Sequence, residues 1–433
     1  MRLILSTAFL LFSLSTFGQS SKRLIIEVGK LYDSEQKKFL TNQKILIENG
    51  RIKDIGSHIG KKTNIEYLDL SQCTATPGLI DMHTHLLLHQ KQTGDGMVIA
   101  SKVPADERIK QGLGFARENL ASGLTTVRDL GNSGQYLDIA LKKQLAKSKT
   151  PTPTMYVSGP IISPPGGQFS KMAPADSFVI KQEYRVVKGA QDAREAVLEH
   201  IKQGVDVIKV CMNTDNRVLA PDEIATIVKT AHEKGIPVTA HATFDESARD
   251  AVKAGVDGIE HGYILSDSTL MLMAQKGTYL VPTDVTREQA RILVEGIGMK
   301  GKEGEDYAKS FLDGVHDRLK RAVSKGVTII AGSDYYNDIP AMPRGKGAVG
   351  VILSYHEAGI PVNEVLQYAT YNAAKALGAS ESIGNLKKGM KADIVFFNGD
   401  LENDFGHVLF DVKMVMKDGV STYPKGKANA SKK

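Results

Sequence analysis

The amino-acid sequence predicts an α/β fold: a TIM (β/α)8 barrel with a small β-sandwich built from both ends of the chain. Three observations support this prediction. Six helix-like stretches end at a glycine that leads directly into a short apolar strand. These strands are continuous runs rich in Val and Ile, as expected for a parallel sheet covered on both faces. Further strand segments, separated by turns, occur before and after this repeat.

The repeated unit is a helix, a glycine and a buried strand. Glycine commonly ends helices because it adopts a left-handed backbone conformation without strain. The six glycines that precede strands are Gly123, Gly204, Gly235, Gly255, Gly277 and Gly326. Residues 76–85 (TPGLIDMHTH) and 155–159 (MYVSG) add two strands, which brings the number to eight. The clearest helices are expected at residues 193–203, 221–234 and 245–254.

The domain boundaries follow from where this repeat begins and ends. We expect residues 76–384 to form the barrel, with residues 22–75 and 385–423 combining in the β-sandwich. Asn49-Gly50 is a hairpin turn signal within the first of these end segments.

Two insertions are expected within the barrel. Residues 160–188 are rich in Pro, Gly and Ser and predict a lid or substrate loop. Residues 287–325 predict a helix with a break that is rich in Gly and Lys. Both insertions should lie at the rim of the barrel.

The two termini carry signals of their own. Residues 1–18 combine an arginine, an apolar run and small residues, as a secretory signal peptide does. We therefore expect a secreted protein, periplasmic in a Gram-negative bacterium, with no membrane insertion because no segment reaches the length of a spanning helix. The basic tail at residues 424–433 should be disordered.

Composition excludes other classes of function. The 433 residues are 42% hydrophobic, enough for a barrel and a smaller domain. Of the formal charge of +6, one unit belongs to Arg2 and four to lysines of the tail, which leaves +1 for the folded body. Nothing in this pattern indicates a nucleic-acid partner. The sequence leaves a monomer and a homo-oligomer both open.

The sequence Asp81-Met82-His83-Thr84-His85 is the strongest functional signal. In a β-strand, side chains two residues apart point to the same face, so His83 and His85 converge. Two neutral imidazoles held in this way make half of a divalent metal site. A surface pair without a ligand is the alternative for this motif taken alone.

Four other strands end at residues of the type that a hydrolytic metal site needs. In a TIM barrel the chemistry lies at the carboxyl ends of the strands. Lys209, His241, His261 and Asp334 occupy such ends. Each of them has a structural explanation by itself, but their shared location at one rim favours a common site.

These motifs resemble those of the amidohydrolase superfamily, in particular its imidazolonepropionase-like and Xaa-Pro dipeptidase-like members. The matching stretches are TPGLIDMHTH, SGLTTVRDLG, GVDVIKV, VTAHA, AGVDGIEHG, AGSD, YATYNAAKALG and GNLKKGMKADIVFF. The resemblance implies two divalent metal ions, with zinc expected and Mn, Co or Ni equally compatible with the ligands. It assigns His83, His85 and Asp334 to one ion, His241 and His261 to the second, and a carboxylated Lys209 to both.

Elementary electrostatics agrees with a carboxylated lysine. An ammonium about 4 Å from a dication is repelled by several kcal/mol even at an intermediate dielectric, whereas a neutral buried amine is able to capture carbon dioxide. The expected mechanism uses a metal-bridging hydroxide, with Asp334 as general base and then general acid. Asp81 either orients a histidine or makes a buried polar contact to the bottom of the barrel.

The expected reaction is hydrolysis of an amide in a dipeptide or an N-acyl amino acid. Related enzymes often carry a histidine in a GGHG loop and a tyrosine after the fifth strand, where this chain has Gln168 and Thr243. Both departures put the dipeptidase subtype in doubt. Tyr263 and Arg344 are candidates for binding a substrate carboxylate, with packing at the rim as the alternative.

Other assignments remain open at this stage. Hydrolysis of a cyclic amide, such as an imidazolone, or of a lactone is the alternative within the superfamily, and a non-catalytic binding protein is the alternative outside it. Arg128 is expected to form a structural ion pair. Cys73 and Cys211 are expected at opposite ends of the barrel and hence as free thiols.

Overall fold

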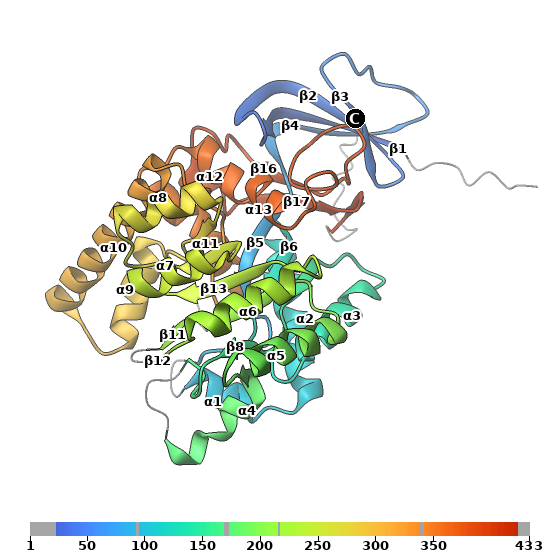
Figure 1. Cartoon of the computed structure of the whole chain (residues 1–433). Coiled ribbons are helices and arrows are strands. Elements are labelled where there is room, and N and C mark those ends of the chain that lie inside the picture. The colour runs from blue at the N-terminus through green and yellow to red at the C-terminus, as the bar shows by residue number, and fades with distance from the viewer. Residues whose placement is uncertain are drawn as a thin grey trace, which may run out of the picture.

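The computed structural model describes residues 23–422, except residues 92–94, 169–172, 215–216, 338 and 340–341. The expected signal peptide and the expected disordered tail lie outside the described residues. Figure 1 shows many helices around extended strands, with a smaller part made mainly of strands at one end.

The smaller part is a seven-stranded sheet to which both ends of the chain contribute. Its strands, in spatial order, are β18 (Val420–Ser421), β17 (Val412–Lys417), β16 (Ile394–Asn398), β4 (Glu66–Pro77), β1 (Arg23–Asp33), β2 (Lys38–Glu48) and β3 (Arg51–Ile55). These strands are hydrogen-bonded into one sheet. β4 connects its two halves, because it pairs with β1 along one part and with β16 along the other.

Apolar side chains from both halves of this sheet pack into one cluster. Ile26 of β1 contributes to it together with Ile394 and Phe396 of β16, and all three are fully buried. Asn49 and Gly50 have φ angles of 52° and 79°, which joins β2 to β3 through the expected hairpin turn. The cluster therefore connects strands that lie more than three hundred residues apart in the sequence.

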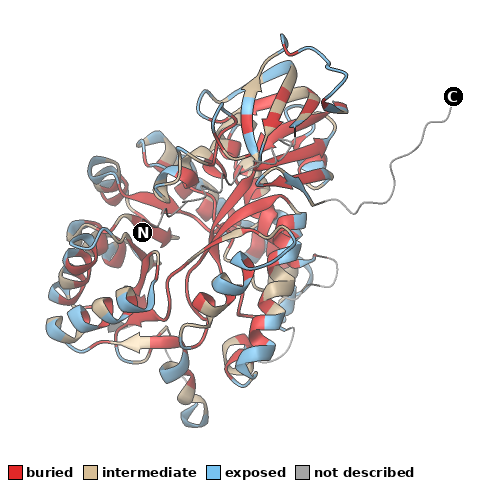
Figure 2. Cartoon of the chain, turned by 90° about the vertical axis from the view of Figure 1, so that its right-hand side faces the viewer, coloured by how far each residue is buried: buried red, intermediate tan, exposed pale blue. Residues whose placement is uncertain are grey.

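The larger part contains two sheets of parallel strands. One has the order β5 (Leu79–Thr84), β6 (Leu124–Asp129), β7 (Thr154–Val157). The other has the order β15 (Tyr279–Val281), β14 (Gly258–His261), β13 (Val238–Ala242), β10 (Ile208–Cys211), β8 (Ile161–Ser163), β9 (Tyr184–Val186). Figure 2 shows that these strands are buried almost throughout, which fits their uninterrupted apolar sequences.

The third expected strand is divided between the two sheets. It begins as β7, which pairs with β6, and continues after a short break as β8, which pairs with β10. Gly159 lies in the break with a φ angle of 69°, a left-handed conformation that interrupts an extended strand.

The eighth expected strand is a looser segment at residues 328–331. It makes one β-bridge, between Ile329 and Leu280 of β15. On its other side, the Met82 amide of β5 donates to the Ala331 carbonyl at 2.9 Å. This segment therefore lies between the edge strands of the two sheets.

Helices follow most of the parallel strands (Figure 1). They are α1 (Gly96–Ser101), α2 (Ala105–Ala121), α3 (Leu137–Ala146), α4 (Phe178–Glu183), α5 (Ala190–Gln203), α6 (Pro221–His232), α7 (Asp245–Ala254), α8 (Asp267–Lys276), α9 (Arg287–Gly296), α10 (Gly301–Ser324), α11 (Arg344–Glu357), α12 (Val362–Tyr368), α13 (Tyr371–Ala376) and α14 (Phe405–Val408). The three helices expected most clearly are present as α5, α6 and α7. Across the described ranges, no helix combines the length and the apolar character needed to span a bilayer.

The two insertions also have defined structure. The first contains β8, a short 3-10 helix (Pro174–Asp176), α4 and β9, so its described residues are more regular than a loop. The second is α9 and α10, and the expected Gly/Lys-rich break separates them. Two further short strands, β11 (Asn213–Thr214) and β12 (Arg217–Val218), form a hairpin after β10. Cys73 in β4 and Cys211 in β10 are buried and are not joined in a disulfide, as expected.

Replacing Phe396 by alanine should destabilise the protein strongly. The side chain is fully buried between the terminal segments, and truncation of a buried phenylalanine costs about 3–5 kcal/mol. Denaturant unfolding of Phe396→Ala should show this loss, whereas Leu40→Ala, at a position 38% exposed in the same sheet, should change stability by about 0.5 kcal/mol or less. Equal effects of the two substitutions would show that the cluster does not hold the chain ends together.

Candidate metal centre

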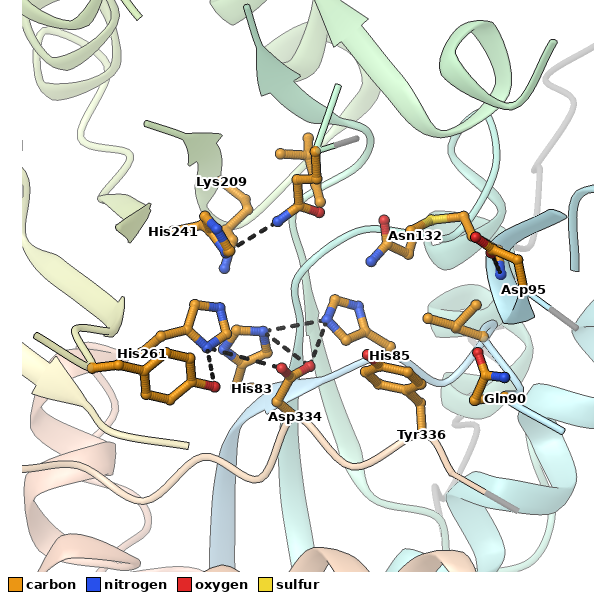
Figure 3. Close-up of a pocket in the computed structure, with 15 residues that line it drawn as sticks. His83, His85, Gln90, Asp95, Asn132, Lys209, His241, His261, Asp334 and Tyr336 are labelled. Carbon is orange, nitrogen blue, oxygen red and sulfur yellow. Dashed lines mark hydrogen bonds and ion pairs between the residues drawn. The ribbon is translucent and has the colours of Figure 1, made fainter. Parts of the chain in front are cut away.

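The six expected ligand residues lie at one end of the parallel strands. His83 belongs to β5, Lys209 to β10 and His241 to β13, while His261 is the last residue of β14. His85 follows β5, and Asp334 follows the segment that lies beside β5. Carboxyl ends of parallel strands meet at one edge, so residues more than two hundred positions apart become neighbours (Figure 3).

The imidazoles face one another around the Asp334 carboxylate. The Nε2 atoms of His83 and His85 are 3.3 Å apart. Asp334 Oδ1 lies 3.1 Å from His85 Nε2 and 3.6 Å from His83 Nε2, and its Oδ2 lies 3.9 Å from His261 Nδ1. The rings of His241 and His261 have centroids 4.6 Å apart. His83, His261 and Asp334 are arranged so that three ligand atoms lie within 4.8 Å of one another.

Two of these residues adopt a left-handed backbone. His261 has a φ angle of 70° and Asp334 a φ angle of 49°, values that are uncommon for residues with a side chain. Such strain persists only where the surrounding structure enforces it, and it is concentrated at functional sites. In this structure, it directs both side chains toward the centre (Figure 3).

Lys209 is buried beside the histidines. Its side chain is 1% exposed, and within the described part of the chain its Nζ has no hydrogen-bond partner. Burial lowers the pKa of this amine to about 8, although Glu260 and Asp334 act in the opposite direction. The amine therefore loses its proton more readily than an exposed lysine does, and a neutral amine is a nucleophile.

Most of the imidazoles are held in the neutral form that binds metals. Burial, followed by the charge of Lys209, lowers the pKa of His83 to about 4 and that of His241 to about 3. Burial and the neighbouring histidines place the pKa of His261 well below its usual value. His85 differs: burial lowers its pKa, but the hydrogen bond and charge of Asp334, together with the charge of Asp129, outweigh burial and raise the pKa. A cation near His83, His241 and His261 would therefore meet unprotonated nitrogen ligands.

Glu260 is a functional residue that the sequence analysis missed. Its fully buried carboxylate accepts from His83 Nδ1 at 2.7 Å, from Arg128 at 2.6 Å and from Thr239 at 2.5 Å. Burial alone raises the pKa of this carboxyl, but Arg128 and His83 outweigh it and hold the pKa well below the usual range. The carboxylate therefore fixes the ring of His83 and leaves its Nε2 directed at the centre. An acidic residue directly before a ligand histidine in an apolar strand was the available signal.

Arg128 forms the ion pair that the sequence predicts. Besides Glu260, its guanidinium binds the Met82 carbonyl at 2.7 Å and the Tyr279 hydroxyl at 2.8 Å. Its positive charge therefore has partners on β5, β14 and β15. This distribution of bonds connects the strands that carry the ligands.

Asp81 accepts hydrogen bonds from backbone amides and a serine hydroxyl rather than from a histidine ring. Its Oδ1 accepts from the amides of His83 and Ser333, and its Oδ2 accepts from the Ser333 hydroxyl at 2.6 Å. The Asp334 amide then donates to the His83 carbonyl at 2.8 Å. Asp81 therefore makes a buried polar contact beside the ligand residues, not at the bottom of the barrel, and this contact anchors the segment that carries Asp334.

A cavity of about 380 Å³ opens over the ligand cluster. Gln168 lines it and places its Nε2 3.1 Å from His241 Nδ1, while its Oε1 accepts from the Tyr184 hydroxyl at 3.0 Å. Tyr263 also lines the cavity, with its hydroxyl 3.4 Å from His261 Nδ1. Gln90, Asp95, Asn132 and Tyr336 complete the polar lining, and the sequence had not singled them out.

Arg344 lies elsewhere, which corrects its expected role in binding a substrate carboxylate. The side chain is 4% exposed, and its guanidinium donates to the backbone carbonyls of His85, Leu88 and Tyr335. It also stacks on the Phe115 ring at 4.1 Å. Its charge is therefore used to hold the loops after β5 and before α11, and it is not among the described residues that line the cavity.

Comparison with known proteins decides the family. A model of the amidohydrolase family matches residues 74–422. The chain belongs to the amidohydrolase family. Enzymes of this family are hydrolases that act on carbon–nitrogen bonds and generally use divalent metals, so the ligand cluster lies where such an enzyme needs it.

Individual amidohydrolases show a moderate likeness over most of the chain. Ochratoxinase from Aspergillus niger is 27% identical over 408 residues, which cover 87% of this chain and 81% of that enzyme. Imidazolonepropionase from Clostridium tetani is 24% identical over 435 residues, covering 89% and 92%. The crystal structure of a Xaa-Pro dipeptidase with bound methionine is 27% identical, covers 92% of this chain and 99% of that chain, and superposes with a TM-score of 0.80.

Replacing Glu260 by glutamine should weaken metal binding. Glutamine keeps the volume but loses the charge that fixes the His83 ring, and loss of such a partner costs about 10- to 100-fold in metal affinity. Competition with a chromogenic chelator measures this affinity. Glu223→Gln is the matched control, because Glu223 is also a buried glutamate but accepts from the amides of Gly189 and Ala220. If both variants bound the metal with equal affinity, Glu260 would have no specific role in metal binding.

Proposed function

We propose that this amidohydrolase holds two divalent metal ions, most readily zinc, and hydrolyses the amide bond of a dipeptide or an N-acyl amino acid. His83, His85 and Asp334 would hold one ion, and His241 and His261 the second. The observation that carries the proposal is the convergence of four imidazoles and a carboxylate around a buried lysine without a hydrogen-bond partner among the described residues. Imidazole and carboxylate ligands together fit zinc and its neighbours among the transition metals.

Lys209 would join the two ions after reaction with carbon dioxide. The neutral amine forms a nitrogen–carbon bond to carbon dioxide, an electron pair of one C=O bond moves to oxygen, and the nitrogen loses a proton to water. The product is a carbamate with one negative charge and two oxygens. Burial supports this step by lowering the pKa of the amine. Among the described residues Nζ has no hydrogen-bond partner, and Lys209 lines the cavity.

Asp334 is the residue that we propose moves the proton. Divalent ions bound at this centre would polarise the substrate carbonyl and lower the pKa of a water molecule. The Asp334 carboxylate takes the proton that this water loses and then gives it to the nitrogen of the departing amine. Its left-handed backbone and its contacts to His83 and His85 fix where the proton is delivered. Gln168, and with it Tyr263, lines the same cavity and would contact the substrate.

The substrate class is supported by the relatives. The similarity to ochratoxinase and to a Xaa-Pro dipeptidase favours linear amides. The similarity to imidazolonepropionases favours a second candidate, hydrolysis of a cyclic amide or a lactone. Because Gln168 stands where related sequences often have a histidine, an activity test must include linear amides as well as cyclic amides and lactones.

We further propose that the two parallel sheets form one closed (β/α)8 barrel over residues 76–384. The division of one strand into β7 and β8 and the hydrogen bonds of residues 328–331 support closure at the two seams. The seven-stranded sheet would fold over its own apolar cluster as a small sandwich of residues 22–75 and 385–423. Residues 1–18 would direct export, to the periplasm in a Gram-negative bacterium.

The protein should contain about two divalent ions per chain, as expected for a two-metal site, and Lys209→Met should lose at least one of them. Methionine keeps much of the length of the side chain but is unable to form a carbamate. Elemental analysis of the purified protein measures the metal content. Lys417→Met is the matched control, since Lys417 is equally buried but pairs with Asp393 in the terminal sheet. Unchanged metal content in Lys209→Met would contradict the bridging role.

The zinc-loaded protein should hydrolyse some N-acetyl amino acids or Xaa-Pro and Xaa-Arg dipeptides. Asp334→Asn should lower kcat by at least about 10²-fold, the usual contribution of general acid–base catalysis. Release of free amine measures the reaction. Cleavage of cyclic amides or lactones alone would support the second candidate, and metal binding without turnover of any of these compounds would support a non-catalytic protein.

A further inference from the structure

A second cavity, of about 240 Å³, adjoins the cavity over the metal centre. Tyr263, Asp334 and Tyr336 line both cavities, so the second begins where the first ends. Asp334 thus lies at the boundary between them. None of the histidines of the centre belongs to the described lining of the second cavity.

Aromatic and aliphatic side chains form one part of the wall of the second cavity, and polar residues form the rest. Tyr263 and Phe311 face each other with ring centroids 6.2 Å apart and planes inclined by 65°, an edge-to-face arrangement. Leu293 of α9 and Val351 of α11 contribute aliphatic surface. Phe311 is 40% exposed, an unusual exposure for a large apolar side chain next to a reactive centre. This apolar part of the wall favours a flat apolar group.

Among the described side chains that line this cavity, only Asp284 has a buried polar atom without a hydrogen-bond partner. Asp284 lines the cavity, is 2% exposed, and places Oδ1 2.5 Å from Nη2 of the fully buried Arg318. Among the described residues, Asp284 Oδ2 has no hydrogen-bond partner. The pair is close to neutral overall, but a buried acceptor without a partner costs about 1–3 kcal/mol. A neutral hydrogen-bond donor on a ligand would satisfy it.

The position of Asp334 determines which part of a substrate enters this cavity. In amide hydrolysis, the carbonyl must lie over the metal ligands, whereas the departing nitrogen must lie within hydrogen-bonding distance of the proton donor. The first cavity contains the histidines, and therefore receives the acyl side. The second cavity touches Asp334 but no histidine in the described chain, so the amine side is able to extend into it.

We infer that the second cavity binds the side chain of the amino acid released as the amine, and that this side chain is an aromatic ring bearing a hydrogen-bond donor. This inference rests on the proposed amide hydrolysis and specifies its substrate. Tyrosine fits it best, because the ring meets Tyr263 and Phe311 while the hydroxyl reaches Asp284. Phenylalanine offers the ring without the donor, and glycine offers neither.

Filling the second cavity with a larger side chain tests whether the substrate side chain binds there. Leu293→Trp should lower kcat/KM for N-acetyl-L-tyrosine by about tenfold or more and leave that for N-acetylglycine within about twofold, because only the larger group competes with the new side chain. Ile292→Trp is the matched control: Ile292 is adjacent and similarly buried, but packs against the main core instead of lining the cavity. Equal losses for both substrates, or equal effects of both variants, would overturn the placement.

Removing the Asp284–Arg318 pair tests whether Asp284 binds a hydrogen-bond donor on the substrate side chain. The double variant Asp284→Leu/Arg318→Met avoids leaving one buried charge unpaired. The wild-type protein should prefer N-acetyl-L-tyrosine over N-acetyl-L-phenylalanine by about tenfold, and the double variant should lose this preference. A preference that survives in the double variant, or no preference in the wild-type protein, would contradict the role of Asp284.

Binding of free amino acids separates this inference from the proposed function. Calorimetric titration of the zinc-loaded protein should show that L-tyrosine binds, whereas glycine binds too weakly to detect. The substitution Leu293→Trp should weaken the binding of L-tyrosine about tenfold. This result together with no hydrolysis of any amide would reject the proposed reaction and retain the cavity as a site for an aromatic side chain. Hydrolysis with no difference between L-tyrosine and glycine would retain the reaction and reject the cavity.

Discussion

The centre depends on the buried carboxylate of Glu260. This group binds His83 of β5, Arg128 of β6 and Thr239 of β13 while standing on β14 itself. Three strands besides its own are therefore held in register by one side chain, at the level directly beneath the ligands. Arg128 extends the network to Tyr279 of β15. Because the carboxylate is fully buried, moving any of these strands would leave a charge or a donor unpaired, which is far more costly than a lost surface contact.

Much of the centre was predictable because it is encoded locally. The His83/His85 spacing and the strand-end positions of Lys209, His241 and Asp334 follow from strand parity and from the glycines that begin the strands. Arg344 was assigned to the substrate because an arginine near the rim has an obvious use. Its guanidinium donates to backbone carbonyls, which carry no sequence signal. Glu260 was missed for a related reason: its partners lie 177, 132 and 21 residues away.

The fold shows the same division between local and distant information. Helices α5, α6 and α7 and the hairpin at Asn49-Gly50 were predictable because capping and turn residues act within a few positions. The course of β4 was not, since its two halves choose partners from opposite ends of the chain. The sheet also contacts the start of β5, where the Gly78 amide donates to the Asp393 carbonyl at 2.8 Å. The terminal strands thus fix the beginning of the strand that delivers His83.

Asp334 shows how the backbone positions the carboxylate that we propose as the proton donor. A left-handed aspartate is unfavourable by itself, yet the preceding residues allow no relaxation. Ser333 is bound on both its amide and its hydroxyl by Asp81, and a Cβ at Gly332 would lie 2.4 Å from Val281 and 2.9 Å from His83. The segment is therefore locked between β5 and β15. The same lock places the carboxylate between the two cavities, so the strain that the fold tolerates at Asp334 would determine where the proposed proton transfer takes place.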